Sequence, residues 1–123
     1  MEDLINRIAA ETGLSTDAAQ KAVGHIFAYM KAEGTDPAVG TMLAETPGAQ
    51  AAIDSVGEGG GGGIMSMFGA GIMGLGSKLM GLGLDMGQIR LVATELVGYA
   101  KAHAGAETVD RVIATTPGLS QFA

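Results

Sequence analysis

The sequence contains no cysteine and no tryptophan, and aromatic residues make up only 4% of its 123 residues. Without cysteine, the chain cannot form disulfides, zinc fingers or iron–sulfur clusters, and it cannot use thiol catalysis. Basic residues are also scarce, because seven Lys and Arg stand against thirteen Asp and Glu, a formal net charge of −6. An acidic protein repels the phosphate backbone, so we expect no nucleic-acid partner.

What the sequence has in abundance is apolar residues, at 47%, together with 21 glycines and eight methionines. This much apolar surface has to be buried in a core or against a partner, and 123 residues suit a single domain. The N-terminus is acidic and has no apolar segment of signal-peptide length. We therefore expect a cytoplasmic protein, with the membrane surface as the alternative location.

The chain aligns with itself without gaps at an offset of 70 residues, which pairs residues 13–53 with residues 83–123. Ten of the 41 aligned positions are identical, among them Tyr29 with Tyr99 and Lys31 with Lys101. The run Thr46–Gly48 also matches Thr116–Gly118. The alignment predicts two related halves, 1–56 and 84–123, each built around a helical hairpin.

Apolar residues recur at helical spacing in both halves, and no segment alternates as a strand would. Ser15 and Asp85 are the expected N-caps of the two long helices, and Gln88 completes a capping box with Asp85. Thr46 and Pro47 are expected to begin a further short helix that reaches about Val56. The fold class is therefore predicted as all-α, a small bundle of six or seven helices.

The segment between the halves is the sharpest change of composition, since residues 57–87 hold 13 of the 21 glycines and five of the eight methionines. Residues 59–63 are all glycine, and we interpret 57–63 as a hinge. Residues 64–83 form a Gly/Met-rich apolar central segment, whose apolar stripe keeps helical spacing from Ile64 to Ile89.

Three roles are open for this stripe: a helix in the core, an interface with a partner or second copy, and a membrane anchor over 64–84. Ser66, Ala70 and Gly74 lie four residues apart, a spacing that lets two helices approach closely. The candidate contact residues for a partner, an oligomer or a membrane are Ile64, Met67, Phe68, Ala70, Ile72, Gly74, Leu75, Leu79 and Leu82.

Catalytic and metal-binding motifs are not recognisable. Residues 69–74 match G-x-G-x-x-G, but no strand precedes them, so a dinucleotide site is not predicted. His25 and His103 are the only imidazoles, and no nucleophile is paired with a base. We expect no catalytic residue, no metal site and no cofactor, and we predict that the protein is not an enzyme.

The run Leu79–Gln88 and the closing Thr116–Leu119 resemble those of small bacterial proteins grouped as VcgC/VcgE-like domains of unknown function. The resemblance covers most of the chain and implies an all-α fold and a bacterial origin. It implies no particular chemistry, because that family has no established activity.

These observations predict a non-enzymatic protein-interaction or self-association module whose partner is itself or another protein. One alternative is a protein that associates with membrane lipid through 64–84. A weaker alternative is a carrier of an apolar small ligand held between methionine-lined helices.

Overall fold

The computed structural model describes residues 2–33, 36–56 and 71–115, and within these ranges it contains seven α-helices and no strand. This confirms the predicted all-α fold. The glycine run 59–63 lies outside the described residues. The helices are α1 (Glu2–Thr12), α2 (Thr16–Glu33), α3 (Ala38–Glu45), α4 (Ala49–Ser55), α6 (Gly71–Gly81), α7 (Met86–Ala104) and α8 (Ala106–Thr115).

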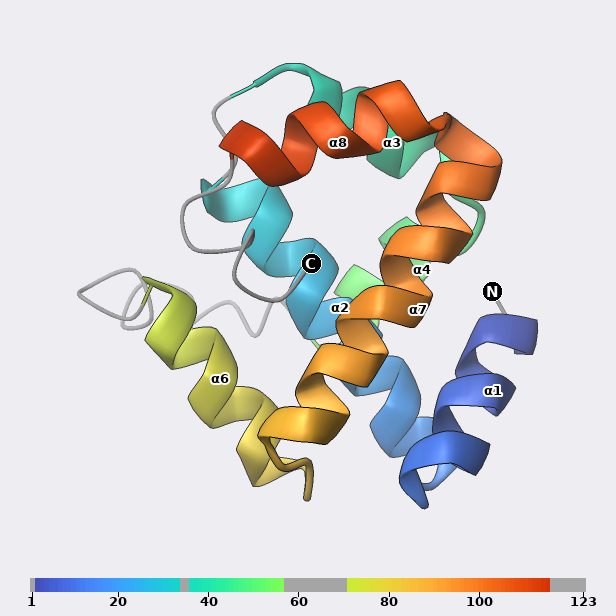
Figure 1. Ribbon diagram of the computed structural model, residues 1–123, viewed down its shortest axis with the longest axis vertical. Helices are drawn as coiled ribbons and strands as arrows, with labels where there is room; N and C mark the ends of the chain where they lie inside the picture. Colours follow the sequence, from blue (N-terminus) through green and yellow to red (C-terminus); the bar gives the residue numbers. More distant parts are fainter. Residues whose placement is uncertain (1, 34–35, 57–70, 116–123) are drawn as a thin grey trace.

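The two long helices, α2 and α7, form the centre of the bundle and contact each other (Figure 1). Both α1 and α6 pack against α2 and α7 at one end of the molecule. At the other end, α3 and α8 lie side by side, and α4 packs against α2. Each half of the chain therefore contributes helices to both ends of the bundle.

The core consists of the apolar stripes that the sequence predicted. Phe27 and Met30 of α2, Met42 of α3 and Leu96 of α7 are fully buried, and so is Ile8 of α1. Burying such a side chain contributes about 1.5–3 kcal/mol relative to leaving it in water. The described helices bury the apolar residues that recur at helical spacing, which confirms the predicted amphipathic pattern.

The predicted capping residues begin their helices as expected. The hydroxyl of Ser15 accepts a hydrogen bond from the Ala18 amide at 3.1 Å. At the start of α7, Asp85 accepts from the Gln88 amide at 2.8 Å, and the Gln88 side chain accepts from the Asp85 amide at 3.0 Å. The Gln88 side chain also donates to the carbonyl of Thr12 at 3.0 Å, which ties α7 to the end of α1.

The break between the central segment and the second half lies where the sequence predicted it: α6 ends at Gly81, and Gly83 adopts a left-handed φ of 103° before α7 begins. One expectation about helix boundaries is wrong. Thr46 does not start a helix, since its hydroxyl donates to the Met42 carbonyl at 2.6 Å and closes α3. The following helix, α4, begins only at Ala49.

Helices in the first half begin and end at nearly the same aligned positions as helices in the second half, at the offset of 70 residues. This offset places Thr16, where α2 begins, on Met86, where α7 begins, and it places the last residue of α3 on the last residue of α8. The bounds of α1 and α6 correspond to within one residue. The second half can therefore serve as an internal reference for the first.

The expected closed hairpin forms in the second half but not in the first. Only Gly105 separates α7 from α8, and these two helices pack closely. In the first half four residues separate α2 from α3, and α3 packs more extensively against α8 and α7 than against α2. The prediction of two similar hairpins is wrong in this respect, because α3 makes its main contacts with α8 and α7 of the other half of the chain.

Gly24 of α2 is the position at which α4 approaches most closely. A Cβ atom at Gly24 would overlap the carbonyl oxygen of Ala52 and would stand 3.0 Å from the Val56 side chain. We expect Gly24→Ala to lower the free energy of unfolding by about 1–3 kcal/mol, because backbone has to move to relieve the overlap. Gly98→Ala is the control: it fills open space in α7 and should stabilise the protein by about 0.5–1 kcal/mol. Urea unfolding measures both, and equal effects of the two substitutions would contradict the close approach.

Candidate functional site

The structure places the predicted contact residues in different environments. Leu75 and Leu79 of α6 are buried in the core, and Leu82 is partly buried against it. Ile72 and Gly74 lie within α6, but their side chains are outside the described part. Ile64, Met67, Phe68 and Ala70 lie outside the described residues altogether.

Over residues 75–81, where the side chains of α6 are described, Met80 is the one exposed large apolar group. Ser77 and Lys78 are exposed, and Met80 is 50% exposed. Met86, at the start of α7, is 51% exposed. Among the described helices, none combines the length and apolar character that a bilayer crossing requires. Of the apolar side chains described on α6, most therefore serve the core.

Comparison of Leu79→Ala with Met80→Ala tests whether α6 serves the core or forms a contact with a partner. Leu79 is only 1% exposed, so its truncation should lower the free energy of unfolding by about 2–4 kcal/mol. Met80→Ala should change this quantity by less than about 0.5 kcal/mol, because half of the side chain is already in solvent. Thermal unfolding and sedimentation velocity should be measured together. If Leu79→Ala leaves stability unchanged, α6 is not part of the core in solution.

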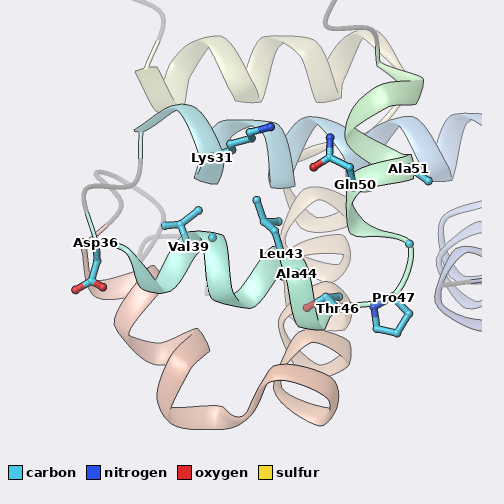
Figure 2. A pocket seen from close by; sticks show the side chains of 11 residues that line it. Lys31, Asp36, Val39, Leu43, Ala44, Thr46, Pro47, Gln50 and Ala51 are labelled. Carbon is cyan, nitrogen blue, oxygen red and sulfur yellow. The ribbon is translucent and has the colours of Figure 1, made fainter.

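A concave surface lies elsewhere, between the C-terminal end of α2, the upper face of α3 and the start of α4 (Figure 2). This groove has a volume of about 760 Å³ and is open to solvent along one side. Val39 and Leu43 project from α3 at the base of this groove, where they are only 6% and 8% exposed and belong to the core. Ala44 and Ala51 are small, exposed residues on the α3 and α4 sides.

Three polar side chains stand around this groove: Lys31 on α2, Asp36 before α3 and Gln50 on α4. Asp36 is engaged, because its carboxylate accepts from the Ala38 amide at 2.8 Å and lies 3.9 Å from Arg111 Nε. The Gln50 amide donates to Asp54 at 3.1 Å. Lys31 is exposed and makes no ion pair within the described residues.

This groove was not predicted from the sequence. Two features of the sequence bear on it: Asp36 and Pro37 begin a new helix after α2, and the 70-residue alignment places Gly40 opposite Asp110. Neither feature reveals that α3 lies apart from α2, because that depends on packing between the halves.

No cluster of side chains with the geometry of a metal site occurs within the described ranges, where no three His, Asp or Glu residues converge. The two histidines lie apart. His103 stacks beside Tyr99 with ring centroids 4.4 Å apart, and the Tyr99 hydroxyl donates to the Pro47 carbonyl at 3.1 Å. This last bond links α7 to the first half of the chain.

His25 is half-buried on α2. Burial lowers its pKa below 6.5, and the positive charges of Lys78 and Lys21 lower it further. In the unfolded chain the imidazole regains its ordinary pKa, so below about pH 6.5 the unfolded state binds more protons than the folded state. His25 therefore makes the folded protein less stable as the pH falls through this window.

His25→Gln should reduce this pH dependence. Between pH 7 and pH 5 the free energy of unfolding of the unsubstituted protein should fall more steeply than that of His25→Gln, because glutamine does not titrate. Urea unfolding at half-unit pH steps measures both slopes. The carboxylates titrate equally in both proteins, so identical slopes would show that His25 has an ordinary pKa.

Comparison with known proteins gives no further guide to this site: no family model, no curated protein and no solved structure matches the chain. The resemblance to VcgC/VcgE-like proteins therefore stays a prediction of the sequence.

Proposed function

We propose that the protein is a non-enzymatic interaction module that binds a short segment of a partner protein in the groove between α2, α3 and α4. The observation that carries this proposal is the concave surface between three helices, where the buried side chains of Val39 and Leu43 form the base and Lys31 stands exposed at the rim. Grooves of this kind, with an apolar base and a polar rim, receive helices or extended peptides in other proteins.

The shape of the groove favours a peptide over a small ligand. A site for a small molecule encloses most of the surface of its ligand, with walls on nearly every side. The groove between α2, α3 and α4 is instead open along its length, and its rim carries charged and amide groups. A peptide can contact the floor with one or two apolar side chains while its remaining surface stays in water.

The groove is also held in shape without a ligand. α3 is anchored by α8 and α7, and α4 is anchored on α2 by the close approach at Gly24. The groove walls therefore need not reorganise on binding, which lowers the free-energy cost of association.

Selection of 12-residue peptides displayed on phage tests this proposal. Peptides should be enriched on the unsubstituted protein, and a fluorescein-labelled copy of an enriched peptide should bind with measurable affinity in fluorescence polarisation. Ala44→Trp should weaken that binding more than tenfold, because an indole on α3 would fill the groove. Ala114→Trp is the matched control: Ala114 is exposed at the aligned position of α8 and lies outside the groove.

Failure to enrich any peptide would overturn the proposal, and so would peptides that bind Ala44→Trp as well as the unsubstituted protein. Sedimentation velocity at several concentrations belongs beside this test. A dimer that Ala44→Trp dissociates would identify a second copy of this chain as the occupant of the groove.

A further inference from the structure

We propose that the groove selects acidic segments, and that a carboxylate of the partner pairs with Lys31 in the space above Gly40. This inference rests on the proposed function and adds the chemistry of the partner. Three observations carry it: an ion pair in the second half, the space at Gly40, and the neighbouring charges.

The second half shows what occupies the corresponding place when it is closed. Lys101, which aligns with Lys31, pairs with Asp110 of α8, with 3.2 Å between Nζ and Oδ1. Val109 is fully buried and Ile113 is partly buried beside that aspartate. A carboxylate and two apolar side chains from a helix thus cover the end of α7.

The first half keeps the lysine and the apolar residues but lacks the carboxylate. Val39 and Leu43 align with Val109 and Ile113, and Gly40 stands in the position of Asp110. A Cβ at Gly40 would meet no atom within 4 Å. The groove therefore combines an exposed ammonium group with free space above Gly40 in which the carboxylate of another chain fits, over a base whose apolar side chains are largely covered.

The neighbouring charges restrict where that carboxylate can lie. Asp36 stands at the α3 end of the groove, where it caps the Ala38 amide and lies beside Arg111. A partner carboxylate close to Asp36 would be repelled, whereas one near Lys31 would be attracted. The favoured partner segment carries one acidic residue at the Lys31 side and an apolar residue within about one helical turn of it.

The test uses the peptides selected above. Enriched sequences should share an Asp or Glu next to an apolar residue, and replacing that acidic residue by its amide should weaken binding roughly two- to fivefold, the range of an exposed ion pair. Lys31→Met should weaken binding to the same degree and should abolish the difference between the acid and the amide. Lys101→Met is the matched control and should leave the affinity unchanged, since Lys101 lies outside the groove.

Substitution of Gly40 gives an independent readout. Gly40→Asp restores the residue found at the aligned position and should compete for Lys31, so acidic peptides should bind it more weakly than they bind Gly40→Asn. The two substitutions add nearly equal volume, and both project into open space, so neither should prevent folding. Circular dichroism verifies the fold of each variant.

The outcomes separate this inference from the proposed function. Peptides that bind in the groove without an acidic preference, and with unchanged affinity for Lys31→Met, would overturn the inference and leave the proposed function standing. Equal binding to Gly40→Asp and Gly40→Asn would also overturn the inference. If no peptide is enriched, both proposals fail.

Discussion

The burial of two apolar stripes, one on α2 and one on α7, is the constraint on which the rest of this structure depends. Phe27 and Met30 on α2, and Val92 and Leu96 on α7, are excluded from solvent. The shorter helices complete the core around these two: α1 and α6 contact both at one end, and α3 and α8 close the other. With few aromatic residues and no disulfide, the fold depends on contacts between apolar side chains, most of which are aliphatic.

Features that depend on neighbouring residues could be predicted from the sequence. Ser15 and the pair Asp85 and Gln88 cap helices because their side chains reach amides within the same turn, and the apolar stripes follow from helical period alone. Gly13, Gly83 and Gly105 all adopt positive φ at helix ends. The end of α6 lies within two residues of the predicted end of the central segment at residue 83, whereas the start of α4 was predicted too early, at Thr46.

The candidate site could not be predicted because it depends on distance between helices. The sequence places Lys31, Val39 and Leu43 within fifteen residues, but their local spacing is also compatible with a closed hairpin like that of α7 and α8. What opens the groove is the preference of α3 for α8 and α7 over α2. Such a preference is the sum of many contacts between the halves, which no local pattern reveals.

Comparison of the two halves explains how one helical arrangement can serve two purposes. In the second half the Lys101 and Asp110 side chains form an ion pair that joins α7 to α8 across a one-residue junction. The charge of Lys101 is therefore paired within the chain. In the first half a glycine replaces the aspartate, and α3 is held by the opposite half instead of by α2. Stability and an open groove are therefore compatible here, because α3 makes most of its contacts with α8 and α7 and few with α2. A groove whose walls are fixed by core packing keeps its shape in the unbound protein, and its selectivity then depends on the few side chains at its rim.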